Sequence, residues 1–469
     1  MDLIIIGVYF TVIIGIGLYA SRGQKTMESY ALGDRSMPWW AVVASILASE
    51  ISAGTFLGTP GEGFAKRNFL YAQLVIGTIL ARLLVAAIFI KPFYKYNVTS
   101  IYEFLEIRFG TLTRRLASVV FLLTRSLASG SRIFIAAILL VLAWEVAHPE
   151  FAQMSKDERF HQELVIYAGA VILITGLTAL YTTIGGIKAV VWTDLIQITL
   201  MFGAALYVFF WLLGKTGGWE ALQSSVVAPV VIDTGIRPGK NFGEHVHFIL
   251  TQEYTIWAAL LGSIFTTLAT HGTDQDMVQR MLTSKDAKRG QRAVIISGLI
   301  DLPVVVGFLA IGILVWRYYE MFPANKPVGD PGIFAWFMGH DLKPGVRGLI
   351  AAGLFATAMG SLSTALNALA TTFTKDWYLG VFLVGMLTKT RGSCKGNLLG
   401  MIAGFVAVGF LTNLPNDIWN MLLGHPLYKN PDWLPIIAFT WRIMFGTLVT
   451  VGVALCFRSK PNRMLTAGV

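Results

Sequence analysis

The chain has 469 residues, of which 55% are hydrophobic and only 14% are charged, and its mean hydropathy is +0.63. This composition is far too apolar for a soluble protein of that length, so it excludes a soluble globular domain and indicates a polytopic membrane protein. The formal net charge of +10 comes from Lys and Arg in short loops, which is typical of cytoplasmic loops and argues against a nucleic-acid partner. Two cysteines, Cys394 and Cys456, offer neither a disulfide framework nor metal-ligand spacing.

Long apolar segments follow one another along the whole chain, and most reach the ~20 residues that a bilayer-spanning helix needs. The eleven segments are residues 3–20, 38–59, 69–90, 116–146, 164–182, 189–213, 246–270, 292–316, 346–374, 397–412 and 435–457. The first has no basic region and no small-residue cleavage site, so we expect a retained helix rather than a signal peptide. No loop is long enough for a soluble domain, and we predict one all-α transmembrane domain over residues 1–469.

Basic clusters occupy alternate connections between these segments. They lie at residues 22–35, 91–115, 188 and 280–292, after the first, third, fifth and seventh segments. The positive-inside rule therefore predicts a multi-pass protein of the cytoplasmic membrane, with the N-terminus outside and the C-terminus inside.

The second segment contains an unusual polar stretch, residues 45–59, which reads SILASEISAGTFLGT. Glu50 stands there beside Ser, Thr and Gly, and a charge at bilayer depth costs about 2.5–3.5 kcal/mol on insertion scales, so it marks a candidate functional site. The small and hydroxyl residues predict a helix broken near residues 48–54, whose free carbonyls could hold a cation. A polar contact between helices is the competing interpretation.

Further polar side chains interrupt later segments. Asp194 lies at the start of the sixth segment and Asp301 lies inside the eighth. The ninth carries a dense run of hydroxyls at residues 357–367, where positions 357, 360, 361 and 364 share one helical face. Hard cations prefer oxygen ligands, which such a face supplies. Small-residue packing between helices would leave the same pattern.

Motifs in a fixed order resemble those of the sodium:solute symporters over nearly the whole chain. They are residues 28–35 (ESYALGDR), 57–61 (LGTPG), 99–109 (TSIYEFLEIRF), 185–197 (GGIKAVVWTDLIQ), 274–280 (DQDMVQR) and 361–376. The resemblance implies a leucine-transporter-like fold with two inverted repeats, here about 38–213 and 246–412. It also implies a sodium-coupled symporter whose partners are Na⁺, a small solute and the bilayer, with a monomeric transport unit, no other cofactor and no enzyme activity.

The resemblance also implies the sodium ligands. The principal site would use the backbone carbonyls of Ala48, Ile51 and Thr357 and the hydroxyl of Ser361. Gly360 stands where the family usually has Ser, and Glu50 would replace that missing ligand. A second sodium site would use Asp194, Ser363 and Thr364. For Asp194 the alternative is a structural aspartate that caps the sixth helix.

The sequence does not identify the solute. Thr55 and Gln73 match or neighbour cavity positions of the family, and His271, next to Thr270, falls near its inner gate. Asp301 stands where sugar-transporting members have Lys, and it either contacts the solute or pairs with an Arg of a neighbouring helix. We expect a sugar, a sugar acid or a similar hydroxylated solute. A proline-like amino acid and a monocarboxylate are the alternatives.

One departure from the family follows Tyr378. The basic Lys375 and Lys389 flank only about a dozen apolar residues, too few to span a bilayer. The sequence therefore predicts that one family helix is missing and that the second repeat is incomplete. A transport-inactive sensor or interaction protein that keeps the fold is the alternative that this gap favours, and no metal cluster or nucleophile–base motif suggests an enzyme.

Overall fold

The computed structural model describes residues 1–20, 27–147, 156–227, 232–327, 332–372, 394–411 and 439–457. These residues form helices of α, 3-10 and π type, and within these ranges the only β pairing is an isolated bridge between Met37 and Ser284. The prediction of an all-α protein is confirmed. The region after Tyr378, where we predict a missing family helix, lies outside the described residues.

The chain divides into two compact units that interleave along the sequence. Unit 1 comprises Met1–Phe69, Leu123–Pro229 and Gln279–Thr371, and unit 2 comprises Leu70–Leu122, Val230–Val278 and Thr372–Val469. The single transmembrane domain with two repeats stays a prediction.

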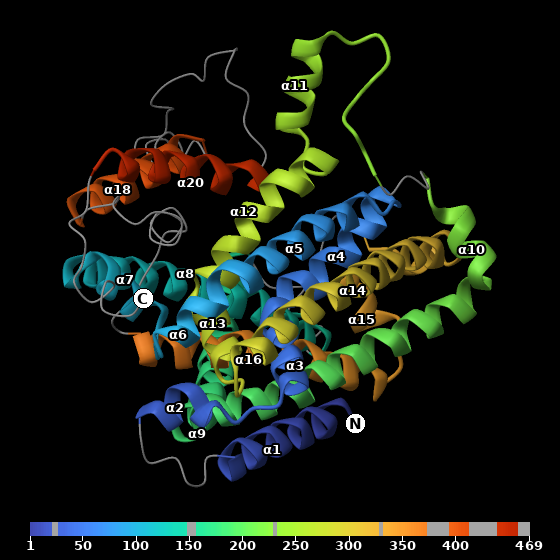
Figure 1. Cartoon of the computed structure of the whole chain (residues 1–469). Helices are drawn as coiled ribbons and strands as arrows, with labels where there is room; N and C mark the ends of the chain where they lie inside the picture. Colours follow the sequence, from blue (N-terminus) through green and yellow to red (C-terminus); the bar gives the residue numbers. More distant parts are fainter. Residues whose placement is uncertain are drawn as a thin grey trace. The chain divides into compact units, whose positions relative to one another are not determined.

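Unit 1 contains the long helices of the molecule (Figure 1). Its elements are α1 (Asp2–Ala20), α2 (Met27–Leu32), η1 (Gly33–Arg35), α3 (Trp39–Glu50), α4 (Ala53–Lys66), most of α8 (Thr111–Ala147), α9 (Lys156–Thr216), α10 (Gly218–Ser225), α14 (Ala287–Met321), η7 (Pro323–Asn325), α15 (Ile333–His340) and α16 (Val346–Thr372). Helix α3 packs against α9 and α14, α4 packs against α14, and α1 packs against α9. Every residue of α3 from Ala41 to Ser49 is buried, so the polar groups on this helix need partners inside the protein.

Helix α9 joins two segments that the sequence predicts as separate spans, 164–182 and 189–213. The helical pattern is interrupted at Gly186, whose backbone angles are φ 50° and ψ −158°. Glycine tolerates this region because it lacks a Cβ, so the turn between the two predicted spans is made by one residue. Lys188, just after it, binds Asp34 of η1 with an N–O distance of 2.5 Å and lowers the pKa of that carboxyl.

Unit 2 is built from shorter helical pieces. They are η2 (Leu70–Gln73), α5 (Leu74–Leu84), η3 (Val85–Ile90), α6 (Lys91–Lys95), α7 (Ile101–Phe109), α11 (Phe242–Thr251), η5 (Ala258–Ser263), α12 (Ile264–Thr267), η6 (Leu268–Gly272), α18 (Cys394–Leu411) and α20 (Phe439–Leu455), with the beginnings of α8 and of α13 (Gln275–Leu282). Gln275 joins two family-like motifs, because its Oε1 accepts from the Ile101 N–H at 3.0 Å. The π-helical turns of η3, η5 and η6 are of a type that proteins often place at functional sites.

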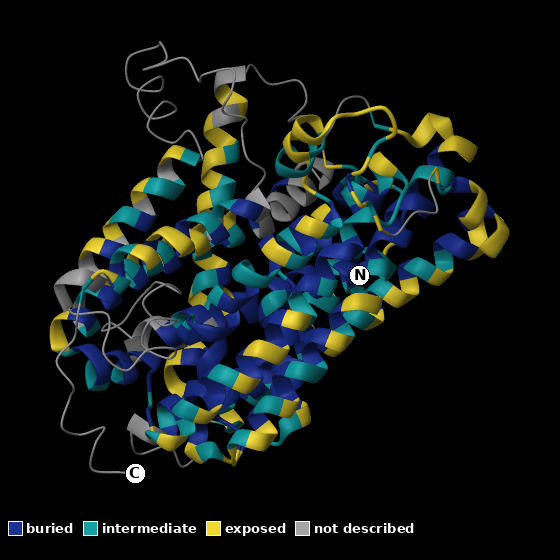
Figure 2. Ribbon diagram, turned by 45° about the horizontal axis from the view of Figure 1, so that its top comes forward, coloured by how far each residue is buried: buried dark blue, intermediate teal, exposed yellow. Residues whose placement is uncertain are grey.

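Among the described residues, four helical stretches are long and apolar enough to cross a membrane, and a fifth is the bent pair α3–α4. The four are Leu70–Lys95, His161–Thr216, Ala287–Met321 and Val346–Ser363. Exposed and buried positions alternate along the helices (Figure 2), and the exposed ones include large apolar side chains such as Ile172, which is 72% exposed. Outward-facing apolar surface of this kind suits a lipid environment.

Candidate functional site

The break between α3 and α4 is the first component of the site. The two helices are bent by 67° over a break of two residues, Ile51 and Ser52. Ile51 has extended angles (φ −76°, ψ 93°), and the Ser52 side chain caps α4 by accepting from the Thr55 N–H at 3.4 Å. The last carbonyls of α3, including that of Ala48, therefore lie at a helix end where the intrahelical bonding partners run out. The predicted discontinuous helix near residues 48–54 is confirmed.

Helix α16 brings three buried hydroxyls to unit 1. Thr357, Ser361 and Ser363 are 3%, 2% and 0% exposed. Each donates its hydroxyl proton to a backbone carbonyl three residues earlier, at 2.7, 3.1 and 3.1 Å respectively. Their oxygen lone pairs can still accept a donor or coordinate a cation. The side chain of Thr364 lies outside the described residues.

A fully buried ion pair joins α9 to α13. Asp194 Oδ2 accepts from Arg280 at 3.0 Å and from the Ser45 hydroxyl at 2.6 Å, and both charged side chains are 0% exposed. Arg280 also donates to the Gly360 carbonyl at 3.4 Å. From its place after the seventh apolar segment, Arg280 is expected in a cytoplasmic loop, but the structure buries it as the partner of Asp194.

The two solute candidates of unit 1 lie on packed helices, α4 and α14. Thr55 is half-buried, and its hydroxyl lies 3.5 Å from the capping hydroxyl of Ser52. Asp301 is 8% exposed and follows the buried Ser297 of α14 by four residues, so both lie on one face of the helix. Glu50, the last residue of α3, is half-buried.

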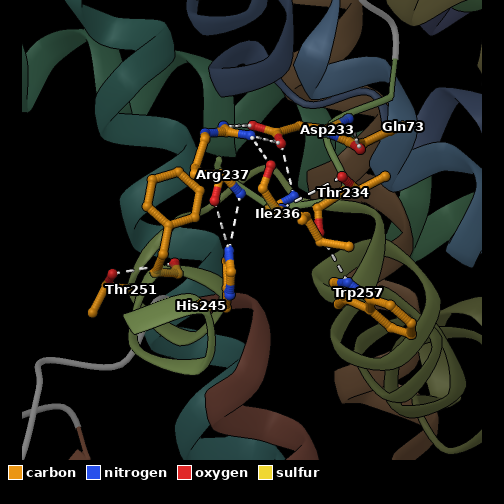
Figure 3. Close-up of polar contacts among 10 residues, drawn as sticks. Gln73, Asp233, Thr234, Ile236, Arg237, His245, Thr251 and Trp257 are labelled. Atoms are coloured by element: carbon orange, nitrogen blue, oxygen red, sulfur yellow. Dashed lines mark hydrogen bonds and ion pairs between the residues drawn. The ribbon is translucent and has the colours of Figure 1, made fainter. Parts of the chain in front are cut away.

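Both solute candidates of unit 2, Gln73 and His271, are buried. Gln73 accepts the Asp233 N–H at 3.1 Å through its Oε1, while its Nε2 has no hydrogen-bond partner among the described residues (Figure 3). Asp233 begins a turn in which Arg237 binds both of its carboxylate oxygens, at 2.8 and 2.5 Å. Hydrogen bonds from Arg237 lower the pKa of Asp233. The donor end of Gln73 therefore remains available for a ligand.

The same turn is closed by His245 of α11. Its Nε2 lies 3.1 Å from the Arg237 nitrogen and 2.9 Å from the Arg237 carbonyl oxygen, and Figure 3 shows the ring aimed at this backbone. Trp257 donates to the Thr234 carbonyl at 3.0 Å. Separately, His271 is 2% exposed, and its Nδ1 lies 2.9 Å from the Thr270 hydroxyl.

Comparison with known proteins identifies the family. The model of the sodium:solute symporter family matches residues 30–148 and 159–444. The chain belongs to the sodium:solute symporter family. A sodium/sialic acid symporter of Proteus mirabilis (strain HI4320) is 30% identical over 431 residues, which cover 89% of this chain and 80% of the relative. A sodium/glucose cotransporter of Vibrio parahaemolyticus is 28% identical over 408 residues, which cover 81% of this chain and 68% of that relative.

A solved structure supports the same fold for this family member. The substrate-bound, outward-open structure of a Na⁺-coupled sialic acid symporter superposes with a TM-score of 0.74, covers 97% of both chains and shares 24% sequence identity. The leucine-transporter-like fold and the prediction of a sodium-coupled symporter are thereby confirmed. Na⁺ and a small solute are the partners that this family binds. The individual ligand residues predicted from the sequence stay predictions.

Three residues of this region, Ser45, Arg280 and Gln197, are not predicted from the sequence as ligands or partners. Ser45 and Arg280 carry no signal of pairing with Asp194, because the three are far apart in the sequence. Gln197 does carry a sequence signal. It follows Asp194 by three residues, so both side chains lie on the same face of α9.

Proposed function

We propose that this symporter imports a hydroxylated organic acid of the sugar-acid class together with Na⁺ across the cytoplasmic membrane. Each chain acts as its own transport unit, with the N-terminus outside and the C-terminus inside. Support for the solute class comes from the 30% identity to the sialic acid symporter, which is higher than the 28% identity to the glucose cotransporter.

The broken helix carries the proposal for Na⁺. Unwinding at Ile51 and Ser52 leaves carbonyl oxygens without helical partners in a buried place, where a cation is a favourable substitute for water. We assign the carbonyls of Ala48, Ile51 and Thr357 and the hydroxyl of Ser361 to the ion. Glu50, at the end of the same helix, contributes the negative charge that a buried cation needs.

The solute carries a carboxylate and several hydroxyls, and each needs a complementary group. The buried Nε2 of Gln73 is a donor suited to the carboxylate. Asp301 is an acceptor suited to hydroxyls, and Thr55 and His271 can donate or accept. These four contacts are the sequence-based assignments that we retain.

The direct test is uptake into proteoliposomes with an inward Na⁺ gradient. We expect sialic acid to accumulate in Na⁺ medium and not in K⁺ medium, and to outcompete glucose, proline and a short monocarboxylate. Preferred uptake of another solute would overturn the solute class, and uptake that is the same in K⁺ would overturn the coupling. Ser361→Ala should raise the Na⁺ concentration for half-maximal uptake about tenfold, and an unchanged value would place the ion elsewhere.

A further inference from the structure

Gly360 of α16 leaves open a position that three oxygen atoms surround. A Cβ at this residue would lie 3.0 Å from Gln197 Oε1, 3.1 Å from the Ala48 carbonyl oxygen and 3.5 Å from Asp194 Oδ1, and no other heavy atom outside its own helix would be nearer. All three are acceptors, contributed by α9 and α3. Acceptor oxygens that converge in a buried place repel one another unless a donor or a cation lies between them.

Two of these oxygens have no hydrogen-bond partner among the described residues. They are Asp194 Oδ1 and Gln197 Oε1, on side chains that are 0% and 1% exposed. Ser45 and Arg280 bind the other carboxylate oxygen, Oδ2, so Oδ1 remains directed to the Gly360 position.

Tyr9 of α1 fixes the orientation of the Gln197 amide. Its hydroxyl donates to the Met359 sulfur at 3.7 Å, which leaves the hydroxyl oxygen to accept from Gln197 Nε2 at 3.4 Å. With the nitrogen turned toward Tyr9, the amide oxygen faces Gly360. The contacts of Tyr9 with Met359 and Gln197 therefore hold the amide oxygen of Gln197 in the acceptor cluster.

We infer that Gln197 Oε1 and Asp194 Oδ1 bind the transported Na⁺ together with the Ala48 carbonyl, in the space that the missing side chain of Gly360 leaves. This inference rests on the proposed sodium coupling and extends its ligand set. Hard cations such as Ca²⁺ bind oxygens at about 2.3–2.6 Å, and the absence of a Cβ at residue 360 leaves room for these oxygens to approach one ion to that distance. In this arrangement Gln197, rather than the Glu50 side chain expected from the sequence, supplies the oxygen that position 360 lacks.

The carbonyl of Ala48 bears on the number of Na⁺ ions that bind. Ala48 belongs both to this cluster and to the principal site, so the two share one ion rather than holding two. Arg280 already gives Asp194 a permanent cationic partner. Arg280 and the one inferred Na⁺ already place two positive charges at Asp194, and a second Na⁺ would add a third to this buried carboxylate, which a site of low dielectric disfavours. We therefore infer one Na⁺ per solute.

The experiment measures Na⁺-dependent thermal stabilisation of the purified protein without solute, with K⁺ as the reference ion. We expect Gly360→Ala, which fills the position, and Gln197→Leu, which removes the amide oxygen, each to raise the half-saturating Na⁺ concentration at least tenfold. Gly360→Ser also fills the position but supplies a hydroxyl oxygen, so it should bind Na⁺ more tightly than Gly360→Ala.

Gly353→Ala is the matched control. Residue 353 lies two turns earlier on α16 and also faces α9, but its added Cβ would meet only apolar neighbours, with Ala204 Cβ at 3.4 Å. It should leave the Na⁺ response unchanged. Should Gly360→Ala fail to fold, Gln197→Leu carries the test.

The outcomes separate this inference from the proposed function. If the wild-type protein is stabilised by Na⁺ and both Gln197→Leu and Gly360→Ala keep the wild-type half-saturation, the cluster does not bind the ion, although sodium coupling stands. If the wild-type protein itself responds equally to Na⁺ and K⁺, the proposed sodium coupling fails first.

Discussion

Two Asp–Arg pairs of this protein share their chemistry but differ in their access to water. Asp194 and Arg280 are both 0% exposed, whereas the side chains of Asp233 and Arg237 are 13% and 40% exposed. In the exposed pair, Arg237 binds both carboxylate oxygens and orders a turn. In the buried pair, Arg280 binds one oxygen, and the other is left without a hydrogen-bond partner among the residues that the structure describes.

This difference suggests different roles for the two pairs. Burying two charges costs more free energy than their mutual attraction returns unless every remaining lone pair is also satisfied. A buried carboxylate with a vacant oxygen is therefore better explained by a ligand than by stability. In the exposed pair, Arg237 binds both carboxylate oxygens of Asp233, so the pair is explained by its role in ordering the turn.

The sharpest contrast should come from breaking each pair in the same way. In K⁺ buffer, Asp194→Asn removes the buried carboxylate charge that Arg280 faces and should lower the free energy of unfolding by about 3–5 kcal/mol. Asp233→Asn leaves a solvated Arg237 and should cost about 0–1 kcal/mol. Denaturant unfolding in detergent measures both. Equal losses for the two variants would show that the pairs do not differ as their burial implies.

A second contrast concerns the glutamine that accompanies each pair. Gln73→Leu removes the proposed donor to the solute carboxylate and should raise the KM for the acid solute about tenfold, since a hydrogen bond to a charged group contributes roughly 1.5–3 kcal/mol. The half-saturating Na⁺ concentration should stay unchanged, unlike in Gln197→Leu. Asp233→Asn is the control, because it keeps the backbone N–H that Gln73 accepts. An equal effect of Gln73→Leu on Na⁺ and on solute would remove the distinction between the two glutamines.

The sequence predicts the helical class, the broken helix and the family because these depend on local composition and on motif order. It does not predict the burial of Arg280, since a basic residue after an apolar segment has the same local pattern whether it faces the cytoplasm or a carboxylate. The partnership of Ser45, Asp194 and Arg280 depends on packing between α3, α9 and α13, which are distant in the sequence. Gly360 shows the same limit: the sequence reveals the missing hydroxyl, but only the packed helices show which oxygens face that position.

A smaller effect is expected at the residue that orients Gln197. Tyr9→Phe removes the hydroxyl that accepts from Gln197 Nε2, and the loss of one neutral hydrogen bond of about 1 kcal/mol should raise the half-saturating Na⁺ concentration roughly fivefold. Tyr19→Phe, on the same helix but 71% exposed, is the control and should behave as wild type. Thermal stabilisation by Na⁺ measures both. A wild-type response in Tyr9→Phe would mean that the amide is oriented without the tyrosine.

The smallest effect is a pH dependence confined to the exposed pair. Hydrogen bonds from Arg237 hold the pKa of Asp233 below its usual 3.8 in the folded protein. A carboxyl with a lowered folded pKa contributes stability that is fully present above the unfolded pKa and is lost as the pH falls through the folded pKa. The stability difference between wild type and Asp233→Asn should therefore be constant from pH 8 to about pH 5 and shrink below the usual value of 3.8. A difference that changes between pH 8 and pH 5 would point to another titrating group.

The central claim is that one Na⁺ is transported with each solute. The voltage dependence of uptake in proteoliposomes with a fixed Na⁺ gradient tests it most directly. One Na⁺ moving with one anionic sugar acid transfers no net charge. An inside-negative potential, imposed with valinomycin and K⁺, should therefore leave the rate of sialic acid uptake unchanged, and the Hill coefficient for Na⁺ should be one. Uptake that accelerates under the inside-negative potential, with a Hill coefficient near two, would show that a second Na⁺ is coupled and that Arg280 does not take its place.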